Sequence, residues 1–280
     1  MPNTGIISLA IILITVLVSY RGFRDRAFFA RYEFEVEKIL LYKDYRRLVT
    51  AGFLHVNWMH LIFNMLSLVF FSGIVEMTLG TLGFIVIYLG SLIGGHLLSL
   101  FIHRNQGDYS AVGASGAVFG VLFASVALYP NMGIGMFFIP ISIPSWLYAL
   151  AFVLFSIYGI RSRKNNVGHD AHLGGALVGM LLALVMQPQA FIQNYPTILI
   201  ILVPTVVFLY IIITRPHVLL VDNLFYRRHQ DATIDHRYNM QRADQQQEVD
   251  RILDKISKKG MKSLTAKEKE TLKNYSKKVR

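Results

Sequence analysis

Long apolar segments alternate with short polar ones along most of the chain. Seven of them are long enough, or nearly so, to cross a bilayer, which takes roughly 20 apolar residues in a helix. They are Gly5–Tyr20, Phe53–Val75, Leu82–Ile102, Ala111–Tyr129, Trp146–Ile160, Ala171–Gln187 and Tyr195–Thr214. The fifth is short, which predicts a tilted or partly sunken helix. The pattern predicts an all-α fold, a polytopic membrane helix bundle with seven spans.

The segments outside these spans differ in character. The connection Arg21–Gly52 is long and mixed in charge, and its aromatic and basic residues suit a structured loop at the membrane surface. The run Gly5–Tyr20 has no basic segment before it and no small-residue cleavage motif after it, so we interpret it as a retained span. In the tail, the helical spacing of Asp244–Lys259 and the capping-box pattern of Thr265–Glu268 predict a helical hairpin. A solvated basic tail is the alternative.

Composition and charge agree with burial in lipid. Of the 280 residues, 54% are hydrophobic, and none is a cysteine, which excludes disulfides, thiolate chemistry and cysteine-ligated zinc. Between Leu48 and Thr214 the charged residues are only Glu76, Arg104, Asp108, Arg161, Arg163, Lys164 and Asp170. The formal charge of +11 comes from basic residues concentrated in a few loops and the tail. This distribution is typical of membrane topology, and we expect no nucleic-acid partner.

Three polar clusters stand out, because polar groups inside a bilayer are costly. They are His55, His60 and Asn64 in the second span, Gly113-Ala114-Ser115-Gly116 at the start of the fourth, and His169-Asp170-Ala171-His172 at the start of the sixth. Each cluster lies near the beginning of its span, and successive spans alternate in direction. All three clusters therefore open on the same side of the membrane.

Small residues predict how two of these spans pack. Stripes of small residues let membrane helices approach closely, and the stripes here are Gly116 and Gly120 in the fourth span and Ala171, Gly175 and Gly179 in the sixth. Ser115 precedes one stripe by a residue and His172 follows the start of the other, so both side chains project to the same side at similar depth, as a nucleophile and its base require. Phe119 can pack against the imidazole, and His60 and Asn64, four residues apart, can stabilise an oxyanion.

Each of these features also has an explanation other than serine-protease catalysis. A Gly-x-Ser-Gly string is usually a packing contact, and a single intramembrane histidine can belong to a proton path or to a bound cofactor. His96 and His103 fit packing contacts or helix ends. His169 and His172 have a spacing that suits a metal, but the chain has no His-Glu-x-x-His motif and no partnering carboxylate cluster. We therefore expect no metal and no cofactor.

Three motifs together resemble those of the rhomboid intramembrane proteases. They are His55-Val56-Asn57-Trp58-Met59-His60-Leu61-Ile62-Phe63-Asn64, Gly113-Ala114-Ser115-Gly116 and Ala171-His172-Leu173-Gly174-Gly175. Their order and spacing agree with the family, so the resemblance covers about Leu41 to Gln187. The additional C-terminal span resembles the family's six-plus-one subgroup. The resemblance implies that the chain divides into a six-helix catalytic core (1–187), a seventh helix (188–214) and a basic soluble tail (215–280).

The resemblance implies a role for each matching residue. Ser115 is the nucleophile and His172 the base, with Phe119, Gly113 and Gly116 in support. His60, Asn64 and the Ser115 backbone amide form the oxyanion site. Phe119 stands where relatives often have tyrosine. The pair Tyr45-Arg46 and the acidic Glu76 have structural roles.

The function implied is that of an intramembrane serine endopeptidase that cleaves transmembrane segments of other membrane proteins through a Ser-His dyad. The expected partners are membrane-protein substrates and the lipid bilayer, the tail can bind a further partner, and the expected location is the cell membrane. Two other functions remain open: a catalytically inactive rhomboid-like protein that binds membrane clients, and a small transporter or channel. Intact Ser115 and His172 disfavour the first, and the lack of paired intramembrane charges disfavours the second.

The sidedness of the site is a separate question. All 28 lysines and arginines lie in the first, third or fifth loop or in the tail, which share one side of a seven-span protein. The positive-inside rule places that side in the cytoplasm. The resemblance implies the opposite, an extracytoplasmic mouth. We favour the latter, because the rule applies best to short loops and both the first loop and the tail are long.

Overall fold

The computed structural model describes residues 5–136, 139–162 and 168–214, and in the tail residues 249, 251–253, 255–256, 263–265, 268–269, 271–272 and 275. Residues 163–167 of the predicted fifth loop and much of Asp244–Lys259 lie outside these residues. The elements up to Thr214 are α1 (Ile6–Arg24), α2 (Arg26–Tyr32), β1 (Phe34–Glu35), α3 (Val36–Leu40), α4 (Arg47–Thr50), η1 (Ala51–Phe53), α5 (Trp58–Ile102), β2 (Ser110–Ala111), α6 (Ser115–Leu128), β3 (Gly133–Met136), β4 (Ile139–Pro144), α7 (Ser145–Ser162), α8 (His169–Met186) and α9 (Pro188–Thr214).

By length and composition, α1, α5, α8 and α9 can each cross a bilayer, and α6 and α7 are shorter apolar helices. The 45-residue α5 consists of two helices, because Gly80, with φ 70° and ψ 173°, interrupts it. A side chain at such a positive φ would be strained, which glycine avoids. These segments account for the seven predicted spans. The prediction of an all-α polytopic membrane helix bundle is confirmed.

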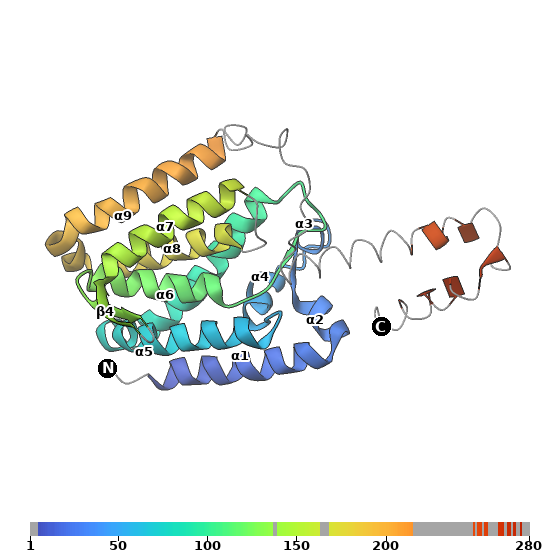
Figure 1. The fold of residues 1–280 in the computed structure, drawn as a ribbon, viewed down its shortest axis with the longest axis horizontal. Helices are drawn as coiled ribbons and strands as arrows, with labels where there is room; N and C mark the ends of the chain where they lie inside the picture. Colours follow the sequence, from blue (N-terminus) through green and yellow to red (C-terminus); the bar gives the residue numbers. More distant parts are fainter. Residues whose placement is uncertain are drawn as a thin grey trace.

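The centre of the bundle is formed by α5, α6 and α8. Figure 1 shows α1 and α9 at opposite edges of the bundle, with α6 and α8 between them. Residues 81–102 of α5 run antiparallel to α8, since Gly83 lies beside Met186 and Gly95 beside Ala171. The two halves of α5 therefore reverse direction at Gly80, as the predicted alternation of spans requires.

The first loop is folded, as predicted. Its short helices enclose a small core of Phe34, Val36, Ile39, Leu48 and Ala51. Arg47 is buried and donates hydrogen bonds from Nη1 to the carbonyl oxygens of Glu33 (2.7 Å) and Ala30 (3.0 Å). Arg46, which the sequence indicates as the structural arginine, is instead exposed and pairs with Asp44 (2.8 Å), where its hydrogen bond lowers the pKa of that carboxyl. The structural arginine of the loop is thus Arg47.

Two features of the bundle differ from the sequence prediction. A hairpin of β3 and β4, with Ile134 opposite Ile143, joins α6 to α7, where the apolar pattern predicts no strand between the fourth and fifth spans. The fifth span is also longer than predicted, because α7 begins one residue earlier, at Ser145, and ends two residues later, at Ser162, so that it has 18 residues.

In the tail, the predicted capping box is present. The Thr265 amide donates to Glu268 Oε2 (2.7 Å), and the Glu268 amide donates to Thr265 Oγ1 (3.3 Å). Lys255 Nζ donates to both oxygens of Glu268, at 2.8 and 2.9 Å, and thereby lowers the pKa of this carboxyl to about 2. Val249 and Ile252 are buried. The Lys255–Glu268 pair joins the two predicted helical segments of the hairpin.

Candidate active site

Ser115 is the first residue of α6, which has only 14 residues. At a rise of 1.5 Å per residue such a helix spans about 21 Å, less than the hydrocarbon thickness of about 30 Å. With Leu128 at the far surface, Ser115 lies about 9 Å inside the near one. The predicted span Ala111–Tyr129 begins four residues too early, because Ser110 and Ala111 form β2, which pairs with β1 of the first loop.

The residues before Ser115 are held in an unusual backbone conformation. Gly113 has φ 133°, which side chains rarely adopt, and its amide donates to the carbonyl oxygen of Ala51 (3.0 Å). A Cβ at Gly113 would lie 2.7 Å from His60 Cε1 and 3.7 Å from Ser115 Oγ. Glycine is therefore required here both by φ and by the approach of the His60 ring.

The structure brings Ser115 and His172 together, with Nε2 of the histidine 2.6 Å from Oγ of the serine. Phe119 packs against the imidazole at 4.8 Å between ring centroids, as its spacing predicts. Phe152 of α7 stacks on Phe119 at 3.9 Å and lies 6.3 Å from the imidazole. The sequence gives no signal for Phe152, because it is one of many aromatic residues in an apolar span and only the packing of α7 places it here.

The glycine stripes of α6 and α8 are in direct contact. A Cβ at Gly175 would collide with the backbone of Gly116, and one at Gly179 with that of Gly120. The pairing of 116 with 175 and of 120 with 179 makes the two helices parallel, as predicted. Such an approach is possible only without side chains, and it brings the start of α8, with His172, beside the start of α6.

We expect Gly175→Ala to lower the unfolding temperature of the protein in detergent. The added methyl group would overlap the Gly116 carbonyl, so the two backbones must separate, and overpacking of this kind costs about 1–3 kcal/mol. Gly135→Ala is the matched control, because nothing lies within 4 Å of a Cβ at that position. Thermal unfolding followed by circular dichroism measures both variants. Equal unfolding temperatures would contradict the contact.

His60 and Asn64 lie one turn apart on α5, beside the Ser115 loop. Asn64 Nδ2 donates to the carbonyl oxygen of His60 (2.9 Å), which leaves its second N–H for another acceptor. His60 Nδ1 is buried without a hydrogen-bond partner among the described residues, and the ring edge with Nε2 faces Gly113. The Ser115 amide belongs to the first turn of α6, whose N–H groups have no intrahelical acceptor. The His60 ring thus lies beside the loop that precedes Ser115, and Asn64 follows one turn further along α5.

His55 contacts other residues and has a structural role that the sequence alone does not assign. Ser19 Oγ of α1 donates to the carbonyl oxygen of Phe53 (2.9 Å) and lies 2.9 Å from His55 Nδ1. Since the hydroxyl has one proton, Nδ1 is the donor to Ser19, and Nε2 accepts from the Ala114 amide (3.4 Å). His55 thus connects α1 to the residue preceding Ser115.

The remaining polar residues near the site have structural partners. Asp170, two residues before His172, lies with Oδ2 3.2 Å from Nε2 of His103, whose ring stacks on Tyr109. His96 Nδ1 bonds the carbonyl oxygen of Leu48 (2.7 Å). The ring of His169 packs against α7 at Phe155. Among the described residues, no three histidine or carboxylate side chains are grouped as a metal site.

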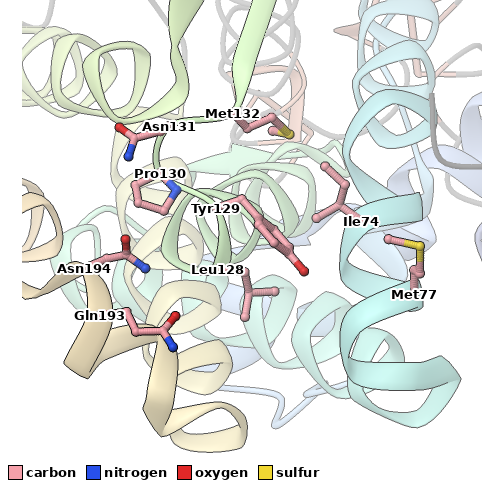
Figure 2. A pocket seen from close by; sticks show the side chains of 9 residues that line it. All are labelled: Ile74, Met77, Leu128, Tyr129, Pro130, Asn131, Met132, Gln193 and Asn194. Atoms are coloured by element: carbon pink, nitrogen blue, oxygen red, sulfur yellow. The ribbon is translucent and has the colours of Figure 1, made fainter.

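Two further sites lie at the opposite end of the bundle. The Glu76 carboxylate accepts a hydrogen bond from Ser8 of α1 (2.8 Å), which agrees with a structural role. A cavity of about 770 Å³ opens nearby (Figure 2), lined by Ile74, Met77, Leu128, Tyr129, Pro130, Asn131, Met132, Gln193 and Asn194. It contains no charged side chain and lies at the far end of α6 from Ser115. It is therefore separate from the Ser115–His172 site.

Comparisons with known proteins agree on one family. The chain is 35% identical over 150 residues to Rhomboid protein 1, mitochondrial, of Saccharomyces cerevisiae (51% of this chain, 43% of the relative). It is 36% identical over 160 residues to Rhomboid-like protein 11, chloroplastic, of Arabidopsis thaliana (52% and 55%) and 29% over 150 residues to RHOMBOID-like protein 12, mitochondrial, of the same plant (48% and 44%). The chain thus spans about half the length of these curated relatives.

Two family models match the chain. A family of unknown function, DUF6576, matches residues 232–278 in the tail. The other is the Rhomboid domain, which matches residues 42–189 and so includes Ser115 and His172. Because this match covers more than half of the 280 residues, the chain belongs to the rhomboid family.

Proposed function

We propose that this protein is an intramembrane serine endopeptidase in which Ser115 and His172 form a catalytic dyad. The observation that carries the proposal is the 2.6 Å distance between Ser115 Oγ and His172 Nε2 at the start of α6. Membership in the rhomboid family, whose members are generally serine intramembrane proteases, supports the same class of reaction.

In the proposed reaction, His172 Nε2 takes the proton of the Ser115 hydroxyl as its oxygen attacks a substrate carbonyl carbon. The oxyanion that forms accepts hydrogen bonds from His60, from Asn64 and from the Ser115 amide. His172 then gives the proton to the leaving amine, and water hydrolyses the acyl-enzyme. Asp170 faces His103, and Phe119 packs on the imidazole, so ring packing, rather than a third acidic residue, orients the base.

The proposed substrates are transmembrane segments of other membrane proteins. Inside lipid a helix satisfies all of its own backbone groups, so its peptide bonds are accessible only where it is locally unwound. Ser115 lies about 9 Å below one surface by the helix-length argument, so we expect cleavage near the end of the substrate span. Helix-breaking or small residues there should favour cleavage, and water enters from the same surface.

A fluorophosphonate probe tests the proposal directly, because it forms a covalent bond only with an activated serine. We expect the purified protein to be labelled at Ser115, and to cleave a model transmembrane substrate in detergent. Ser125→Ala is the matched control, since Ser125 lies on the same helix and donates to the carbonyl oxygen of Leu122 (2.6 Å). Labelling of wild type and Ser125→Ala but not Ser115→Ala supports the dyad. Absence of both labelling and cleavage would favour the inactive, client-binding alternative.

We further propose that the mouth of the site is extracytoplasmic and that the protein lies in the cell membrane. The relatives named above are mitochondrial and chloroplastic proteins. The assignment of this protein to the cell membrane is therefore our proposal and is not taken from these relatives. The division into a catalytic core (1–187), a seventh helix of the six-plus-one type (188–214) and a tail that binds a further partner (215–280) is proposed on the same basis.

Single cysteines test the sidedness, because the chain has none of its own. Asn105 is exposed at the Ser115 end of the bundle, and Gln189 is exposed at the opposite end. With an extracytoplasmic mouth, a membrane-impermeant maleimide should label Asn105→Cys in intact cells and should label Gln189→Cys only after lysis. The reverse result would place the mouth in the cytoplasm, as the distribution of basic residues predicts.

A further inference from the structure

Four exposed arginines lie at the end of α1 and along α2. We call Arg21, Arg24, Arg26 and Arg31 the arginine corner. None of the four pairs with a carboxylate among the described residues, as the guanidinium of Arg46 does. The nearest acidic residue in sequence, Asp25, accepts a hydrogen bond from the Phe28 amide (2.9 Å) as the cap of α2. Asp25 keeps its negative charge, so the four arginines and this carboxylate together have a net charge of +3.

Aromatic rings support two of these guanidinium groups. Arg21 lies over the Phe28 ring (4.4 Å to the centroid) and Arg24 over the Tyr20 ring (4.5 Å). Both aromatic rings and basic residues favour the interface between lipid and water. A guanidinium supported on a ring keeps its N–H donors directed outward, and these donors match the oxygen atoms of a phosphate group.

Trp58 connects this corner to the Ser115 end of the bundle. It is 51% exposed and packs against Phe23 (5.0 Å) and Tyr20 (6.2 Å) of α1. It is also the first residue of α5, two residues before His60. The corner therefore lies at the membrane surface on which the Ser115–His172 site opens.

We propose that the arginine corner binds the phosphate groups of anionic phospholipids in the leaflet at the Ser115 end. Unpaired guanidinium groups, an aromatic support and a position at the lipid–water interface each fit an anionic headgroup, and a zwitterionic headgroup fits less well because its own cation opposes the arginines. Basic residues near an anionic surface each favour association by about fivefold. The inference rests on the fold alone and does not require proteolytic activity.

Fluorescence quenching of Trp58 by brominated lipids measures the preference, because bromine quenches an indole only at close range. The second tryptophan is removed by Trp146→Phe. In bilayers that contain brominated phosphatidylglycerol or brominated phosphatidylcholine, we expect Trp58 to prefer phosphatidylglycerol by about fivefold or more, because the contribution of a single arginine is already about fivefold. The preference should fall as salt is added, because salt screens exposed charges.

Three variants identify the residues responsible. Replacing all four corner arginines with glutamine should reduce the preference to about onefold, and replacing them with lysine should retain most of it. Arg46→Gln is the matched control, since it removes one charge from the same loop but from a group already paired with Asp44, and it should leave the preference unchanged. Circular dichroism checks the fold of each variant. Equal quenching by both lipids in wild type, or a preference that survives the glutamine replacements, would overturn the proposal, as would its loss in Arg46→Gln.

Discussion

Ser115→Ala and His172→Ala should each abolish cleavage of a model transmembrane substrate while leaving the protein folded. In the proposed dyad the serine supplies the attacking oxygen and the histidine removes its proton, so either loss disables the same step, at a cost on the order of 10⁴-fold or more in kcat. Because the two side chains act as a unit at 2.6 Å, the double variant should be no slower than either single one. Gel-based cleavage assays with matched circular dichroism spectra measure this.

His169→Ala is the control that distinguishes the two histidines at the start of α8. The His169 ring lies 6.1 Å from that of His172 and packs against Phe155 of α7. Its loss should therefore leave most of the activity, with a moderate effect through the packing of α7. An equal loss of activity in His169→Ala and His172→Ala would show that the assignment of the base is wrong.

The second large effect is expected at the oxyanion site. Asn64→Ala and His60→Ala should each lower kcat by about a hundredfold with a small change in KM, because a donor that acts only on the transition state contributes about 3 kcal/mol. Asn64 also donates to the carbonyl oxygen of His60, so Asn64→Asp serves as a variant of the same shape that lacks both amide donors. It should be at least as slow as Asn64→Ala, because an ionised carboxylate would also repel the oxyanion.

Steady-state kinetics in detergent separates this effect from a change in binding, and thermal unfolding shows whether a slow variant is also destabilised. A rise in KM at constant kcat would place these residues in ground-state binding. If both single variants and the double variant turn over at the wild-type rate, neither side chain stabilises the oxyanion.

The sequence predicted the architecture well because the bilayer leaves few alternatives. Backbone groups in lipid must be satisfied within helices, so apolar length alone marks the spans. The glycine stripes predicted the packing of α6 against α8 for a related reason, since close helix approach requires small residues at fixed spacing. The parallel contact of Gly116 with Gly175, and with it the meeting of Ser115 and His172, followed from that spacing and the alternation of spans.

Contacts between residues a few positions apart on one helix were predicted equally well from the sequence. The capping box at Thr265 and Glu268 depends on residues three apart in the sequence, and both of its predicted hydrogen bonds are present. The packing of Phe119 on His172 follows from its position one turn after Ser115. Such contacts can be predicted because helical geometry fixes the distance between their positions.

Contacts between distant segments were decided only by the tertiary structure. Phe152 reaches Phe119 because α7 packs beside α6, and His55 reaches the Ala114 amide because the loop before α6 folds back on α5. Whether Arg46 or Arg47 is the buried structural arginine depends on which side chain points into the folded first loop. Two adjacent arginines have the same intrinsic preferences, so the sequence alone does not distinguish them. The sequence determined the spans, their directions and the residues near the site, because lipid and helical periodicity act locally. Which side chains support Ser115 and His172 depends on packing between helices far apart in the chain, which no local pattern encodes.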